Sequence, residues 1–195
     1  MSGRHAEPRV ALAELTSVRT LHGPRVRLDP LGPEHFDAVW PGLADGEMLR
    51  LTGTRATFTE AGVRAHLERI GASDERADWA IIDAASGDFV GEIVLNELDE
   101  ANASMNVRIA LAAGQPGRGY GTEAMIVVLD HAFGAIGLHR VQLDVYAFNP
   151  RAIRSYEKAG FTVEGRQRDT LYWDGEWTDS VLMSVLADDP RATYA

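Results

Sequence analysis

The sequence contains no cysteine among its 195 residues. This absence excludes disulfide bonds, zinc sites with cysteine ligands and enzymes that depend on a cysteine nucleophile. A chain without disulfides gives no sign of an oxidising compartment, so a reducing cytoplasm is the expected location. The six histidines have no partners at the spacing of metal ligands, and we therefore expect no metal site.

Long apolar runs are also missing. No stretch reaches the length of a transmembrane helix, and the N-terminus, which includes Arg4 and Glu7, lacks the apolar core of a signal peptide. We therefore expect no membrane partner. The net charge of −10 argues against nucleic-acid binding. It would raise the local concentration of a cationic substrate, although solubility alone also explains it.

What is present is a composition that is 45% hydrophobic, which is enough for one domain with a sizeable core. Residues 1–22 show little regular pattern and predict a mobile N-terminal arm, with a short helix over Val10 to Leu15 as the alternative. Residues 23–187 form the predicted domain, and residues 188–195 form a tail. Strands are predicted at 25–31, 79–83, 89–98, 105–111, 140–145, 161–171 and 177–186. Helices are predicted after Pro33, Thr59, a glycine segment and Asn149.

The glycine segment lies between a predicted strand and a predicted helix. Residues 117–123 read Gly-Arg-Gly-Tyr-Gly-Thr-Glu, and apolar residues then recur at i, i+3, i+4, i+7 and i+8 from Met125. Glycine lets the backbone turn sharply and approach a ligand, while a helix start offers free N–H groups and a positive dipole end. These features predict a phosphate or pyrophosphate site. A tight strand-to-helix turn without a ligand is the alternative.

Two other phosphate-binding loops do not fit this segment. A nucleoside-triphosphatase P-loop needs Gly-Lys-Ser/Thr, but the lysine nearest this loop is Lys158. A dinucleotide fingerprint needs its third glycine three residues after the second, whereas Gly121 follows Gly119 by two.

A second segment, residues 149–161, reads Asn-Pro-Arg-Ala-Ile-Arg-Ser-Tyr-Glu-Lys-Ala-Gly-Phe. Asn149 is a good N-cap, Pro150 suits the first helical position, and Gly160 ends the helix. Together with the glycine segment before it, this sequence resembles the GNAT superfamily of N-acetyltransferases, in particular its RimJ/RimL-like branch. The resemblance covers roughly residues 24–187.

This resemblance implies an α/β fold of the GNAT type, with a mixed, mostly antiparallel central sheet flanked by helices on both faces. It implies that acetyl-CoA is the acyl donor and that a primary amine, on a small molecule or a protein N-terminus, attacks it without a covalent enzyme intermediate. We also consider a homodimer. Two alternatives stay open: a non-catalytic coenzyme A-binding sensor or partner module, and an acyltransferase for larger acyl groups.

Tyr156 matches the tyrosine that many members of this family place beside the thioester sulfur. We therefore predict that it protonates the leaving thiolate, since an unperturbed phenol with a pKa of about 10 keeps its proton at neutral pH. A core tyrosine on an amphipathic helix is the alternative. Ser155 faces another side of the helix, and Ala152 stands where some relatives have a serine.

The general base is less directly indicated. The family pattern often has an acidic residue in the fourth strand, where this chain has Asn106, and Arg108 replaces a usual glycine. Glu92 and Glu97 on the preceding strand are the remaining candidates, and a water relay would also suffice. Either carboxylate has an ordinary alternative as a solvated strand charge.

The expected coenzyme contacts combine backbone and side chains. The pantetheine arm would pair like an added strand with β-strand backbone, and the pyrophosphate would accept hydrogen bonds from the glycine loop. Arg118 would add positive charge beside the phosphates. Pro116 has no backbone N–H to donate to them, and whether the Gln115 side chain replaces this donor is left open. Asn149 could instead act only as a helix cap, without contacting the coenzyme. Arg151 and Arg154 could instead be solvated. The predicted contacts are Ile109, Ala110, Leu111, Gln115, Gly117, Arg118, Gly119, Tyr120, Gly121, Thr122, Asn149, Arg151 and Arg154.

Overall fold

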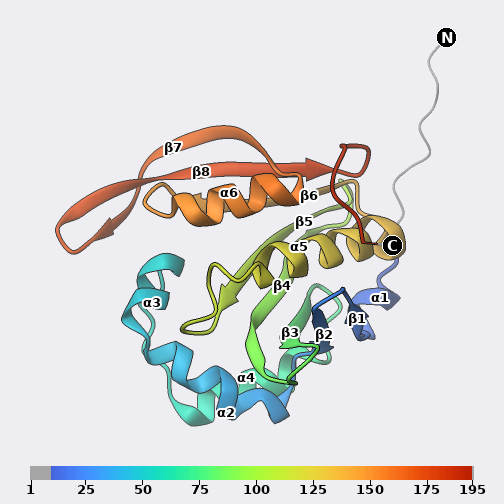
Figure 1. The fold of residues 1–195 in the computed structure, drawn as a ribbon, viewed down its shortest axis with the longest axis horizontal. Helices are drawn as coiled ribbons and strands as arrows, with labels where there is room; N and C mark the ends of the chain where they lie inside the picture. The colour runs from blue at the N-terminus through green and yellow to red at the C-terminus, as the bar shows by residue number, and fades with distance from the viewer. Residues whose placement is uncertain (1–9, 195) are drawn as a thin grey trace.

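The structure is a computed structural model that describes residues 10–194, and its strands form one eight-stranded sheet (Figure 1). The order across the sheet is β1-β2-β3-β4-β5-β6-β8-β7, and only β5 and β6 run parallel to each other. The strands are β1 Leu21–His22, β2 Val26–Pro30, β3 Ala77–Asp83, β4 Phe89–Asp99, β5 Ser104–Leu111, β6 Arg140–Tyr146, β7 Thr162–Trp173 and β8 Glu176–Leu186. The predicted mixed, mostly antiparallel sheet is confirmed.

Helices cover both faces of this sheet, as the sequence predicts. The α-helices are α1 Ala13–Thr16, α2 Phe36–Val39, α3 Gly46–Thr52, α4 Glu60–Ile70, α5 Tyr120–His131 and α6 Pro150–Ala159. Short 3-10 turns at Pro33–His35 and Trp40–Ala44 flank α2, and a π-helical turn at Ala132–Ile136 follows α5.

Strand β3 shows how the two layers are built. Trp79 and Ile81 belong to the large core that includes α5, whereas Ala80 and Ile82 belong to the smaller core beneath α2 and α4. Successive strand side chains point to opposite faces, so burial on both faces requires an uninterrupted apolar run. Residues 77–82 are all buried, which explains why this strand shows no polar alternation.

The chain ends its elements where local chemistry predicts. The Thr59 side chain accepts a hydrogen bond from the Gly62 N–H, and the Asn149 side chain accepts one from Ala152, so both cap their helices. Gly160 ends α6 at a φ of 107°, a left-handed conformation that suits glycine.

Residues 10–22 of the expected mobile arm pack against the domain and include a short helix at Ala13–Thr16, close to the alternative over Val10 to Leu15, while residues 1–9 lie outside the described part. Leu15 on α1 is only 1% exposed, because it packs into the large core. The Ala11 N–H donates to the Ile136 carbonyl at 2.8 Å, and β1 pairs with β2. Apolar side chains between the charged ones hold this segment against the domain.

Helix α3 was not expected. Its first residue is Gly46, a poor helix former, and no residue of the helix is buried, so the sequence shows no apolar stripe there. Asp45 nonetheless caps it, accepting a hydrogen bond from the Met48 N–H at 2.8 Å. Within residues 10–194, none of the helices has the length and apolar character to cross a membrane.

Candidate active site

The two parallel strands separate in the middle of the sheet. β5 and β6 pair only over Ser104–Asn106 and Arg140–Gln142. Beyond these residues, 107–111 pair only with β4, and 143–146 pair only with β8 within the described chain. The facing edges of β5 and β6 therefore offer unpaired backbone N–H and C=O groups to a ligand.

A groove of about 780 Å³ fills this separation. Val107–Leu111 line one side, Asp144–Tyr146 line the other, and the glycine loop and α6 close its mouth. Helix α3, which the sequence did not predict, supplies a further wall through Met48, Leu51 and Thr52. This volume is within the usual range for a small-molecule or cofactor site.

The glycine loop has the backbone that the sequence predicts for an anion site. Gly117 and Gly119 have φ values of 88° and 89°, which other residues rarely adopt. Gly119 is the N-cap of α5, so the first-turn N–H groups of Tyr120, Gly121 and Thr122 have no acceptor inside the helix. A Cβ atom at position 121 would lie 3.3 Å from Leu111 Cδ1, so glycine allows the loop to lie close to β5.

Most of the predicted coenzyme contacts lie around this groove. Gln115, Arg118 and Tyr120 are the exceptions, because their side chains do not line it. Arg118 donates to Gln115 at 2.9 Å, and the buried Tyr120 donates its hydroxyl proton to Asp83. The residues that do line the groove are Ile109, Ala110, Leu111, Gly117, Gly119, Gly121, Thr122, Asn149, Arg151 and Arg154.

Helix α6 brings Tyr156 to the groove. Its ring lies 6.0 Å from that of Phe161 and packs against the large core, while the residue also lines the groove. Burial, together with the nearby Asp144 charge, raises the pKa of Tyr156 to about 12. Ser155 shares a hydrogen bond of 2.6 Å with Thr122, which ties α6 to the start of α5.

The two predicted candidates for the general base, Glu97 and Glu92, differ in whether they line the groove. Glu97 lines the groove from a bulge at the end of β4, with a φ of 55°. Glu92 does not line it. Burial, with Asp78 nearby, raises the pKa of the Glu92 carboxyl.

The structure adds Asp144, which the sequence analysis did not consider. It lies on β6, is exposed, and lines the groove. Its charge contributes to raising the pKa values of both Tyr156 and Tyr146. The signal was available in the sequence: Val141, Leu143 and Val145 alternate inward, which places Asp144 on the opposite face.

Side chains of both charges line the groove. Helix α6 supplies the cationic side chains of Arg151, Arg154 and Lys158, and β5 adds Arg108. The lining also includes carboxylates, which are Asp45, Glu47, Glu97 and Asp144. The groove therefore offers opposite charges both to phosphates and to a cation.

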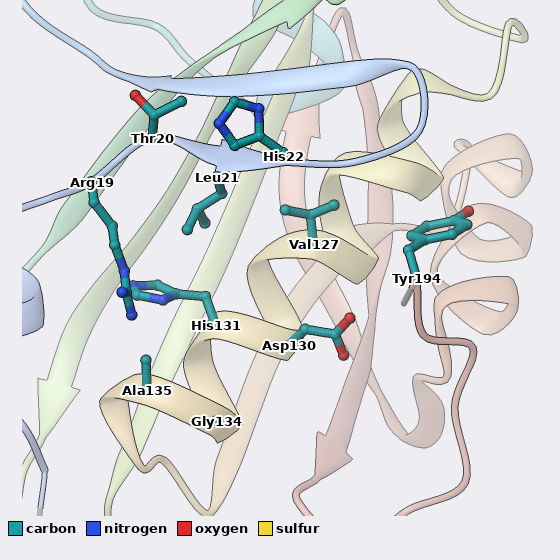
Figure 2. A pocket seen from close by; sticks show the side chains of 10 residues that line it. All are labelled: Arg19, Thr20, Leu21, His22, Val127, Asp130, His131, Gly134, Ala135 and Tyr194. Carbon is teal, nitrogen blue, oxygen red and sulfur yellow. The ribbon is translucent and has the colours of Figure 1, made fainter.

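A second hollow, of about 450 Å³, lies at the opposite end of α5 (Figure 2). Arg19 and His131 lie together on one side of it, and Asp130 and Tyr194 lie on the other. Burial, and then the Arg19 charge, lowers the pKa of His131. None of the described residues that line this hollow belongs to the glycine segment 117–123 or to β5 and β6, so it does not share the chemistry of the groove.

Comparison with known proteins adds family and fold. Residues 25–162 match the acetyltransferase (GNAT) domain. The spermidine N(1)-acetyltransferase of Vibrio cholerae is 27% identical over 106 residues, which are 54% of this chain and 61% of that enzyme. The chain thus matches about three fifths of that relative's length.

Solved structures agree on the fold. A spermidine N-acetyltransferase from Vibrio cholerae, in complex with CoA and spermine, has a TM-score of 0.80 at 19% identity, covering 86% of this chain and 98% of that one. A GCN5-related N-acetyltransferase from Brucella melitensis has a TM-score of 0.75 at 25% identity, covering 95% and 84%. Because the domain match extends over more than half of its length, the chain belongs to the GNAT acetyltransferase family.

Proposed function

We propose that this chain is an acetyl-CoA-dependent N-acetyltransferase that transfers an acetyl group to a primary amine. The observation that carries the proposal is the separation of β5 from β6 with the glycine loop at its mouth. A pantetheine arm can pair with the free backbone of Ile109–Leu111, while a pyrophosphate can accept from the N–H groups at the start of α5. The motif at Asn149–Phe161 supports the RimJ/RimL-like branch.

Acetyl transfer needs little covalent chemistry from the protein, because a thioester is already activated. The amine nitrogen attacks the thioester carbonyl, the carbon–sulfur bond breaks, and one proton must leave nitrogen while another reaches sulfur. Tyr156 is our candidate for the second proton, because it lines the groove and its phenol is protonated at neutral pH. No enzyme-bound acyl group is required.

Two carboxylates in the groove can take the proton from the amine. Asp144 is the stronger candidate, because it lines the groove from β6, one of the two separated strands, and its charge contributes to the raised pKa of Tyr156. Glu97 is the second candidate from the groove lining. Glu92 would act only through intervening groups, because its side chain does not reach the groove.

The carboxylates of the groove favour an acceptor with more than one positive charge. Asp45 is engaged as the N-cap of α3, but Glu47, Glu97 and Asp144 also line the groove, so it offers more than one negative charge to a cation. A small di- or polyamine, which is the acceptor class named for the spermidine acetyltransferase relative, fits better than an uncharged amine or a protein N-terminus. A homodimer and a cytoplasmic location stay predictions.

Calorimetric titration with coenzyme A tests the proposal. We expect one site per chain, with binding that weakens as salt rises because phosphates and arginines contribute. Absence of binding would contradict it. Binding of coenzyme A without acetyl transfer to any amine would favour the non-catalytic sensor alternative. Transfer only from longer acyl-CoA donors would favour the acyltransferase for larger acyl groups.

A further inference from the structure

A buried carboxylate lies directly behind the predicted pyrophosphate site. Glu123 is in the first turn of α5, and its side chain is only 2% exposed. A carboxylate in a first helical turn is favourable for the helix itself, because it faces the positive dipole end. For an anionic ligand at the same helix end it is unfavourable, because two negative charges would share one site.

Arg25 compensates this charge from the loop before β2. Its Nε atom donates to Glu123 at 2.8 Å, and its backbone N–H donates to the same carboxylate at 2.5 Å. The backbone N–H of Val26 adds a third hydrogen bond at 3.0 Å. The carboxylate is therefore fully engaged by a neighbouring strand rather than by the ligand.

The rest of the Arg25 guanidinium reaches the glycine loop. Its Nη1 atom donates to the Arg118 carbonyl at 3.2 Å. A Cβ atom at Gly119 would lie 2.8 Å from Nη2, so the guanidinium lies directly against the N-cap of α5. Arg25 does not line the groove, whereas Gly117 and Gly119 on either side of its contact do.

We propose that Arg25 is a positioning residue for the coenzyme, acting through Glu123 and the glycine loop. It neutralises the carboxylate behind the pyrophosphate site and holds the Arg118–Gly119 backbone in the conformation that presents the α5 N–H groups. This inference rests on the proposed function, because it concerns the same groove. It assigns a phosphate-specific effect to a residue that does not line the groove.

The test uses charge deletion. Arg25→Gln leaves Glu123 as an unpaired buried charge, whereas Arg25→Gln/Glu123→Gln removes both charges and keeps a side-chain acceptor for the N–H groups of residues 25 and 26. Arg27→Gln is the matched control, because Arg27 forms a similar ion pair with Asp29 at 2.7 Å on the same strand. Melting temperatures identify any variant that does not fold.

Calorimetry with coenzyme A should give a Kd for Arg25→Gln that is larger than that of the wild type by about tenfold or more, where tenfold is equivalent to ~1.4 kcal/mol. The double variant should recover most of the affinity, and Arg27→Gln should bind like the wild type. With S-acetylpantetheine, which lacks the pyrophosphate and the nucleotide, kcat/KM of Arg25→Gln should equal that of the wild type. A general structural defect would lower kcat/KM equally for acetyl-CoA and for S-acetylpantetheine.

Wild-type affinity in Arg25→Gln would overturn the inference while leaving the proposed function intact. The same holds for a double variant that recovers nothing, or for equal losses with acetyl-CoA and S-acetylpantetheine. Failure of the wild-type chain to bind coenzyme A would instead overturn the proposed function, and the inference with it.

Discussion

At the scale of single residues, Tyr156 is where packing and proposed chemistry meet. The ring contributes to the large core, and the residue also borders the groove. The same burial that stabilises the ring raises the pKa of its hydroxyl to about 12. A phenol with this pKa stays protonated over the whole neutral range and can serve as a donor to a developing thiolate.

Replacing Tyr156 by phenylalanine keeps the ring and removes only the hydroxyl group, the proposed proton donor. We expect kcat to fall by about 10²–10⁴-fold, the usual contribution of an acid–base group. The Kd for coenzyme A and the melting temperature should barely change. Steady-state kinetics and calorimetry check this, and near-normal turnover in a folded variant would assign the proton to water or to Ser155.

Asp144→Asn tests the proton acceptor. The amide is the same size but cannot take a proton, so kcat/KM should fall by about 10²-fold or more while coenzyme affinity is retained. Glu97→Gln is the matched control, because Glu97 also lines the groove. A large loss in Glu97→Gln with none in Asp144→Asn would move the base to β4.

His131 predicts a pH dependence of folding stability. Burial lowers its pKa in the folded chain, so the unfolded chain binds the proton more readily. The free energy of unfolding should therefore decrease as pH falls through about 6.5, the ordinary histidine pKa. Urea unfolding at several pH values should show a smaller decrease for His131→Phe. Some decrease will remain, because burial also lowers the pKa of His66. An unchanged decrease in the variant would contradict this account.

Single residues also show where sequence reasoning stops. Tyr156 was predicted from its place in a motif and does line the groove, whereas Asp144 was overlooked although strand alternation exposes it. Tyr120 was expected at the ligand, yet its side chain turns to Asp83, which lies 37 positions earlier. Long-range partners of this kind leave no trace in the local pattern.

At the scale of elements, the strands and the long helices followed from periodicity, and two features did not. Helix α3 has no buried residue, so its sequence carries no signal of its place beside the groove. The separation of β5 from β6 depends on pairing partners rather than on residue type. Residues 10–22 pack through scattered apolar side chains such as Leu15, too few and too irregular to show a period.

The glycine loop can be tested as an element. Gly119→Glu introduces a side chain and a negative charge at the N-cap of α5, beside Arg25, whose Nη2 atom would lie 2.8 Å from the new Cβ. Because this disturbs the backbone that we expect to hold the pyrophosphate, coenzyme A binding should weaken at least about tenfold. Gly175→Glu is the control, because Gly175 has a similar φ of 91°, against 89° for Gly119, and lies in the distant β7–β8 turn. Both share the backbone strain of a left-handed residue. Equal coenzyme affinity in the two variants would place the pyrophosphate elsewhere.

At the scale of the whole molecule, the net charge of −10 does not describe the groove, whose lining carries both charges. Arginines and a lysine of α6 line the groove, and so do carboxylates from α3 and its cap, β4 and β6. This combination matches an anionic donor and a cationic acceptor. Screening by salt should therefore weaken the binding of both substrates.

The most direct measurement of the central claim follows free thiol and acetylated amine together. The chain is mixed with acetyl-CoA and a panel of mono-, di- and polyamines, and thiol release is compared with acetylamine formed. We predict equal amounts of the two products, with the highest kcat/KM for amines that carry two or more charges. Coenzyme A binding with no thiol release from any amine would contradict the account.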